Sequence, residues 1–275
     1  MMRAVVLAFL VVPTVALLIH SSSEQRKLTK DTPKITQELL ANLEKKYGGF
    51  VNDVNASNPH FEGGQRKNHW GGDRFGDQSN GNKNMHNYAS FYVKHLNWLV
   101  SRVPQPNVLE VGILAGSGIA IWSELFPESH IYGFDIDISN TLGRQEFLIS
   151  KGFHPKNVML ASFDQMKVDS MRVRTVIGDD TLSFVVDDGC HTPVCALNTW
   201  RSVSPQLSGT FVYIIEDGAC DQHVKDTIMK ENPDLKMDVT KSERQNADGG
   251  YHDIVAFTRE SAEPPLKTHM HVYKA

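Results

Sequence analysis

The chain has 275 residues, which is enough for one sizeable α/β domain with appendages, and 40% of them are apolar, which is enough for a packed core. Its net charge of −4 lacks the basic excess that is typical of nucleic-acid-binding proteins, so we expect no nucleic-acid partner. Three cysteines in a chain of this length exclude a disulfide-rich scaffold.

An apolar run over residues 4–19 opens the chain, with Arg3 before it. The run is short for the ~20 residues that span a bilayer, and no small-residue cleavage site follows it. We interpret residues 1–20 as a signal peptide or a membrane anchor, and residues 21–33 as a polar stalk. This predicts a secretory or membrane-anchored protein, with membrane association through residues 4–19. The alternative is a cytoplasmic protein in which this run is a buried helix.

Two helices and a polar loop are predicted next. The first helix begins after Thr32, whose side chain can cap it, and ends at Gly48. The stretch 50–84 is rich in Gly, Asn, Asp and Gln, and it is predicted to be a long loop with a function. The second helix covers about 85–103. Together these segments form a helical extension over 34–104 that carries an active-site loop.

From residue 107 onward, strands and helices alternate, which is typical of a mostly parallel sheet covered on both faces. We therefore predict a doubly wound α/β domain over 105–260 with a seven-stranded sheet, followed by a tail over 261–275. The last two strands can form an antiparallel edge. The predicted strands are 108–111, 131–134, 158–160, 182–186, 211–215, 235–240 and 252–258, and the predicted helices are 119–126, 141–151, 193–207 and 220–230.

A glycine-rich turn joins the first strand to its helix and contains Gly112 and Gly116. Its spacing is neither that of dinucleotide-binding turns nor that of the P-loop. Glu110 before the turn would repel a pyrophosphate, but it suits a cationic ligand such as S-adenosylmethionine. Asp135 and Asp137 follow the second strand, where a carboxylate can accept both ribose hydroxyls. The alternative is a tight structural turn with solvated acids.

Two consecutive strands of the predicted sheet end in paired acids, Asp187 with Asp188 and Glu216 with Asp217. These carboxylates can converge because neighbouring strands lie ~4.8 Å apart. Converging carboxylates favour a hard cation such as Mg²⁺ or Mn²⁺, although each acid could instead cap the element that follows it. His191 follows Asp188 by three residues and can be a general base, a metal ligand or a structural histidine, of which we favour the base.

The cysteines allow two further interpretations. Cys190, Cys195, Cys220 and His223 could bind zinc, although their spacing matches no closed finger pattern. In a lumenal domain, Cys190 and Cys220 could form a disulfide.

Between about residues 71 and 257, the chain resembles the metal-dependent, macrolide-type sugar O-methyltransferases (mycinamicin and demethylmacrocin O-methyltransferase-like), which have the class I S-adenosylmethionine-dependent methyltransferase fold. The resemblance rests on motifs at 72–77 (with Lys83, His86 and Tyr88), 109–113, 132–137, 164–165, 188–191 and 213–217. Family members usually have Ser where Cys190 stands.

The resemblance implies roles for individual residues. It assigns the Mg²⁺ (or Mn²⁺) ion to Asp188, Glu216 and Asp217, and the general base to His191. The residues expected at the cofactor are Glu110, Gly112, Gly116, Asp135, Asp137, Asp164, Gln165 and Asp187, although Asp187 could be structural instead.

The expected activity is S-adenosylmethionine-dependent O-methylation of a sugar or glycoconjugate. Two neighbouring hydroxyls would chelate the metal, and the loop over 68–88 would close over the site. One alternative is a metal-independent methyltransferase that acts on a small molecule. Another is a membrane-tethered binding protein of the same fold without catalysis. The sequence leaves the oligomeric state open, and a homo-oligomer is allowed.

Overall fold

The computed structural model describes residues 34–48, 74–75, 88–245 and 251–261. All of these residues belong to one compact unit, residues 32–275. None of the helices within the described ranges combines the length and the apolar character needed to cross a membrane. The predicted signal or anchor segment, the polar stalk and nearly all of the predicted tail lie outside the described residues.

The core of the protein is a seven-stranded sheet with the strand order β3-β2-β1-β4-β5-β7-β6. All neighbouring strands are parallel except β7, which runs antiparallel to β5 and β6. This order confirms the predicted doubly wound, Rossmann-like sheet of the class I methyltransferase fold. The strands are β1 (Val108–Val111), β2 (Ile131–Asp135), β3 (Val158–Ser162), β4 (Leu182–Asp187), β5 (Leu207–Ile215), β6 (Lys236–Gln245) and β7 (Tyr251–Arg259).

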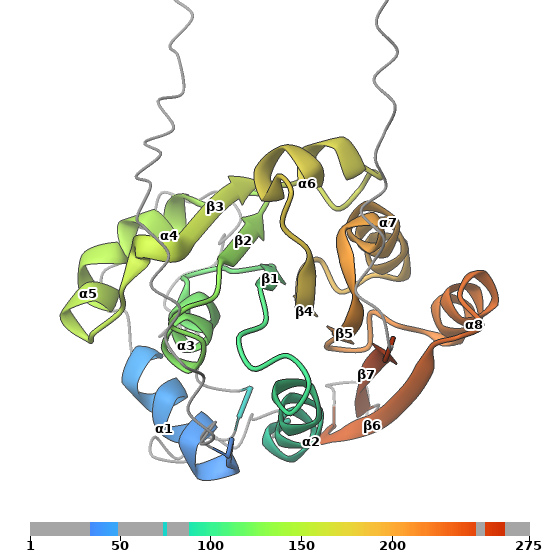
Figure 1. The fold of residues 1–275 in the computed structure, drawn as a ribbon, viewed down its shortest axis with the longest axis horizontal. Coiled ribbons are helices and arrows are strands. Elements are labelled where there is room, and N and C mark those ends of the chain that lie inside the picture. Colours follow the sequence, from blue (N-terminus) through green and yellow to red (C-terminus); the bar gives the residue numbers. More distant parts are fainter. Residues whose placement is uncertain (1–33, 49–73, 76–87, 246–250, 262–275) are drawn as a thin grey trace, which may run out of the picture. The chain divides into compact units, whose positions relative to one another are not determined.

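Helices cover both faces of the sheet (Figure 1). Successive residues of a strand point to opposite faces, so Phe184 of β4 packs in the cluster with α1, α2 and α3, and Val185 packs in the cluster with α6, α7 and α8. Both faces are therefore apolar, which explains the near-continuous apolar strands of the sequence. The helices are α1 (Gln37–Tyr47), α2 (Ala89–Val100), α3 (Ser117–Leu125), α4 (Ser139–Gly143), α5 (Gln145–Ser150), α6 (Ser170–Ile177), α7 (Pro193–Val203) and α8 (Gln222–Glu231), with 3-10 turns at Pro155–Asn157 and Ser204–Gln206.

Helix α1 begins later than predicted. Thr36, rather than Thr32, is the N-cap, and its side chain accepts a hydrogen bond from the backbone N–H of Leu39 at 3.1 Å. At the other end, the Arg144 guanidinium donates to the carbonyl oxygens of Tyr47 (3.2 Å) and Gly48 (2.7 Å). A cation at this position satisfies carbonyls that the helix leaves unpaired and complements its dipole. This contact ties α1 to the segment between β2 and β3.

Three other predictions about the helices differ from the structure. The helix predicted over 141–151 is divided at Arg144 into α4 and α5, and the helix predicted over 193–207 ends at Val203 because Pro205 follows within a 3-10 turn. Helix α6 was not predicted at all. Asp169 caps it, but only Val173 and Ile177 are buried on it, so its apolar periodicity is short.

The order of the strands reverses between β1 and β4, and the loops that follow these two strands pack against each other. Gly112 has a φ of +86°, and a Cβ atom there would overlap the carbonyl oxygen of Asp188. The backbone N–H of Asp188 donates to the carbonyl oxygen of Val111 at 2.9 Å. Ligands of doubly wound sheets bind at this reversal, beyond the carboxyl ends of the strands.

Replacing Gly112 with Ala should destabilise the fold in two ways, through backbone strain at its positive φ and through the clash of the new Cβ with the carbonyl oxygen of Asp188. Gly178 and Gly143 provide matched controls, because a Cβ at either position meets no atom within 4 Å. The two controls differ in the backbone, since φ is positive at Gly178 and not at Gly143. We expect Gly178→Ala to lower the free energy of unfolding by about 1–3 kcal/mol, Gly112→Ala to lower it further, and Gly143→Ala to leave it nearly unchanged. Urea denaturation followed by circular dichroism measures all three, and equal losses for Gly112→Ala and Gly178→Ala would contradict the close packing of the two loops.

Candidate active site

A cavity of about 520 Å³ lies at the carboxyl ends of β1, β2, β4 and β5. This volume is in the range of small-molecule sites. Three of the predicted site residues, Gly116, Asp137 and Asp187, do not line it. The predicted residues that do line it are Glu110, Gly112, Asp135, Asp164, Gln165, Asp188, His191, Glu216 and Asp217.

In the cavity wall, the glycine turn contacts the end of β2. The backbone N–H of Leu114 donates to Oδ2 of Asp135 at 2.9 Å, and the backbone N–H of Asp137 donates to Oδ1 at 3.1 Å. Asp135 is thereby fixed at the edge of the cavity. Gly116 has a packing role instead, because its φ is +80° and a Cβ there would lie 2.6 Å from Cγ2 of Thr141.

Gln165 supports the loop that follows β4. Its Nε2 donates to Oδ1 of Asp187 (2.7 Å) and to Oγ1 of Thr199 (2.8 Å), and its Oε1 accepts from the backbone N–H of Cys190 (2.9 Å). Burial raises the pKa of the Asp187 carboxyl to about 7. Asp187 is therefore buried and hydrogen-bonded to Gln165, outside the cavity lining.

Arg74 also lines the cavity, where it lies among three carboxylates. Its Nη1 is 2.8 Å from Oε1 of Glu110, its Nη2 is 2.7 Å from Oδ2 of Asp188, and its Nε is 3.1 Å from Oε2 of Glu216. Only 12% of the arginine side chain is exposed, so these ion pairs are shielded from water. Sequence reasoning assigned no role to Arg74, although the residue belongs to one of the motifs that carry the family resemblance.

Aromatic side chains donate further hydrogen bonds to Glu110, Glu216 and Asp217. The hydroxyl of Tyr92 donates to Oε1 of Glu216, the hydroxyl of Tyr88 donates to Oδ1 of Asp217 at 2.9 Å, and Nε1 of Trp122 donates to Oε2 of Glu110 at 2.9 Å. Burial raises the pKa of both Glu110 and Glu216 above the usual value, and the charge of Arg74 opposes that rise. Burial also raises the pKa of Tyr88, so its hydroxyl stays protonated as a donor.

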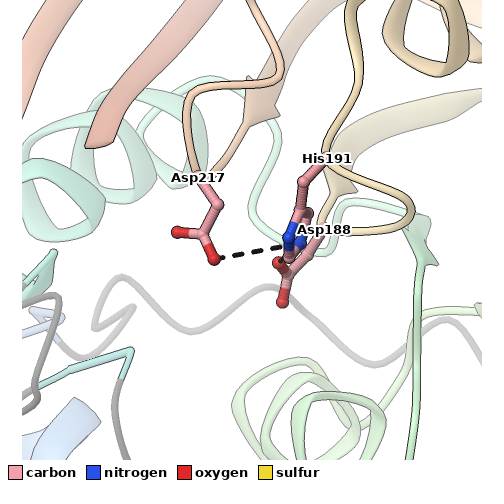
Figure 2. A group of neighbouring side chains, drawn as sticks. All are labelled: Asp188, His191 and Asp217. Atoms are coloured by element: carbon pink, nitrogen blue, oxygen red, sulfur yellow. Dashed lines mark hydrogen bonds and ion pairs between the residues drawn. The ribbon is translucent and has the colours of Figure 1, made fainter. Parts of the chain in front are cut away.

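His191 lies beside two of the predicted metal ligands (Figure 2). Its Nε2 is 3.1 Å from Oδ1 of Asp188 and 3.8 Å from Oδ2 of Asp217. The hydrogen bond to Asp188 raises the pKa of the His191 imidazole to about 9. Among the described residues, Asp188, His191 and Asp217 bring three ligand atoms within 4.8 Å of one another, a group that can hold a metal ion. Glu216 is not in this group.

The cysteines correct a prediction. Cys190 is bonded to Cys195, and Cys220 is a buried free thiol, so a Cys190–Cys220 disulfide is not formed. Helix α7 begins at Pro193, and its first turn brings Cys195 within 6.3 Å (Cα–Cα) of Cys190. The disulfide closes the short loop that carries His191. Since two of the thiols bind each other, the zinc interpretation loses two of its four ligands.

Thiol labelling tests this pairing. Peptide mapping of the folded, unreduced protein should find a Cys190–Cys195 linkage and no labelling of Cys220, because that thiol is only 1% exposed. After mild reduction, we expect a maleimide to label the exposed Cys190 first and Cys220 only on unfolding. A linkage that includes Cys220 would contradict the arrangement.

Known proteins resemble this chain only distantly. No family model matches it. Mycinamicin VI 2''-O-methyltransferase of Micromonospora griseorubida is 23% identical over 154 residues, which are 48% of this chain and 32% of that enzyme. The chain thus spans about a third of the length of the curated relative that it matches.

Two solved structures illustrate the structural likeness. The O-methyltransferase TomG from Streptomyces achromogenes, in complex with SAM, has a TM-score of 0.45 and 13% identity, over 59% of this chain and 77% of that one. The MycE methyltransferase from the mycinamycin biosynthetic pathway, in complex with Mg and SAH, has a TM-score of 0.44 and 18% identity, over 66% of this chain and 52% of that one. The fold assignment rests on the strand order rather than on these scores.

Proposed function

We propose that this protein is an S-adenosylmethionine-dependent O-methyltransferase that a divalent cation assists and that acts on a hydroxyl of a sugar or glycoconjugate. The observation that carries this proposal is that one cavity, at the reversal of strand order, joins the glycine turn and Asp135 to a cluster of carboxylates with His191. The resemblance to mycinamicin VI 2''-O-methyltransferase supports a sugar as the acceptor.

The residues at the glycine turn fit the cofactor. The lack of a side chain at Gly112 lets the backbone approach a ligand closely. Asp135 is fixed by two backbone N–H groups, and each of its oxygens retains a lone pair for a ribose hydroxyl. S-adenosylmethionine supplies an electrophilic methyl group when it is bound. The chain would bring the acceptor close to this methyl group, because His191 lines the same cavity as Gly112 and Asp135.

The cluster of carboxylates in the cavity fits a divalent cation. The cluster consists of four carboxylates, those of Glu110, Asp188, Glu216 and Asp217. Arg74 and His191, whose side chains can be cationic, line the cavity beside them. A hard dication offsets that excess of negative charge, and Asp188 and Asp217 would hold it. Such a cation would lower the pKa of an acceptor hydroxyl that binds to it.

His191 is the proposed general base. Its ring is 44% exposed and lines the cavity, and its hydrogen bond to Asp188 orients it. The same hydrogen bond raises its pKa to about 9, so the imidazole is protonated at neutral pH in the site as described. It can accept a proton near neutral pH only when the negative charge of Asp188 and Asp217 is offset.

We also infer a lumenal or extracellular location. The apolar run over 4–19 supports this location, because we interpret it as a signal peptide or a membrane anchor. The disulfide between Cys190 and Cys195 supports it as well, because disulfides persist in oxidising compartments.

One observation favours a second candidate, a methyltransferase that needs no metal. Arg74 already forms ion pairs with Asp188 and Glu216, two of the three expected ligands. In such an enzyme the acids would only hold Arg74 in place. Full activity of an Asp188→Ala variant would favour this candidate.

Removing metal should abolish methyl transfer. We expect the full chain, incubated with labelled S-adenosylmethionine and a panel of glycans, to lose activity by at least about a hundredfold in a chelator, because the acceptor hydroxyl then remains a weak acid. Added Mg²⁺ should restore the activity. Unchanged activity in the chelator, with no metal detected in the protein, would remove the cation from the proposal.

A His191→Ala variant should lose about 10²–10⁴-fold in kcat, which is the usual contribution of a general base. His154→Ala is the matched control, since His154 is exposed and is not among the residues that line the cavity, and it should keep the activity of the unmodified protein. A loss of less than tenfold for His191→Ala, with the cofactor still bound in calorimetry, would argue against the base.

A further inference from the structure

The guanidinium of Arg74 takes up the carboxylate oxygens that a metal would need. Each of its three nitrogens pairs with a different acid, and these acids belong to three different strand ends: Glu110 lies in β1, Asp188 directly after β4 and Glu216 directly after β5. The fork geometry of arginine suits such multiple pairing. Arg74 therefore lies at the point where the strand ends converge.

The oxygens of two predicted metal ligands are all engaged. Asp188 uses Oδ2 for Arg74 and Oδ1 for His191. Glu216 uses Oε2 for Arg74 and Oε1 for Tyr92, and its side chain is only 3% exposed. A dication on these oxygens would lie against the guanidinium, and like charges at that separation repel strongly where water is excluded.

The backbone of Arg74 is held independently of its side chain. The carboxylate of Glu44, on α1, accepts hydrogen bonds from the backbone N–H groups of Arg74 (2.9 Å) and Phe75 (3.0 Å). The Phe75 ring packs edge-on against Tyr92 and Trp122, with centroids 5.1 and 6.1 Å apart. The Arg74 side chain can therefore leave the acids without displacing the segment that carries it.

We propose that Arg74 is a built-in placeholder cation that neutralises Glu110, Asp188 and Glu216 in the metal-free protein and must release Asp188 and Glu216 when a divalent cation binds. This inference deepens the proposed function and rests on its cation. It reconciles the predicted ligand set with the structure. Glu216 becomes available as a ligand only when Arg74 withdraws.

The test measures binding of Mn²⁺ alone to the full chain by calorimetry, with free Mn²⁺ checked by electron paramagnetic resonance. Arg74→Gln removes the competing charge, so it should bind Mn²⁺ at least about tenfold more tightly than the unmodified protein. Arg201→Gln is the matched control, because Arg201 forms an exposed ion pair with Glu231, and it should bind like the unmodified protein.

Thermal unfolding adds a second measurement. Without metal, Arg74→Gln leaves its acids uncompensated, so its Tm should be lower, and Mn²⁺ should raise its Tm by more than that of the unmodified protein. Should Arg74→Gln not fold, Arg74→Lys keeps a charge but cannot pair with three acids, and its affinity for Mn²⁺ should still exceed that of the unmodified protein.

Two outcomes would overturn the inference in different ways. Equal or weaker Mn²⁺ binding by a folded Arg74 variant would show that Arg74 does not compete with the cation, and it would leave the metal in the proposed function. Absence of Mn²⁺ binding in every variant, with the cofactor still bound, would remove the metal from the proposed function and the placeholder role with it.

Discussion

The negative charge of acids that meet at one edge of a parallel sheet must be offset by positive charge. The arrangement of the whole site depends on this constraint. β1, β4 and β5 end side by side and bring Glu110, Asp188 and Glu216 together. Such buried charges are tolerated only when they are paired, and removing one partner of a buried pair typically costs about 3–5 kcal/mol. Arg74 provides the pairing in the described structure. The elements that hold Arg74 are thus parts of the site.

This constraint gives α1 and α2 a role at the cavity. Glu44 of α1 holds the backbone at Arg74, and Tyr92 of α2 donates to Glu216. Arg144 in turn binds the last carbonyls of α1. The predicted helical extension therefore packs with the sheet. It contacts the acids directly through Tyr92, and indirectly through Glu44, which holds the backbone of Arg74.

The loop that carries His191 is fixed from three directions. Gly112 packs under the carbonyl of Asp188, Gln165 accepts from the backbone N–H of Cys190, and Cys190 is bonded to Cys195 at the start of α7. If His191 is the general base that we propose, it has to be held in a defined orientation relative to the acceptor, and these contacts restrict the loop that carries it. The same loop thus connects the glycine turn to the cluster of carboxylates.

The doubly wound sheet and the edge where the acids meet could be predicted from the sequence alone. Apolar runs mark the strands, and the carboxyl ends of parallel strands share one edge, so Asp188 and Asp217 had to lie near each other. Only the tertiary structure decided that Arg74 lies among Glu110, Asp188 and Glu216, because these partners are 36, 114 and 142 residues away from it in the chain. The partner of Cys190 depended in the same way on where α7 begins. Local patterns determine elements and their order, whereas charge pairing across strands depends on which distant side chains the packing brings together.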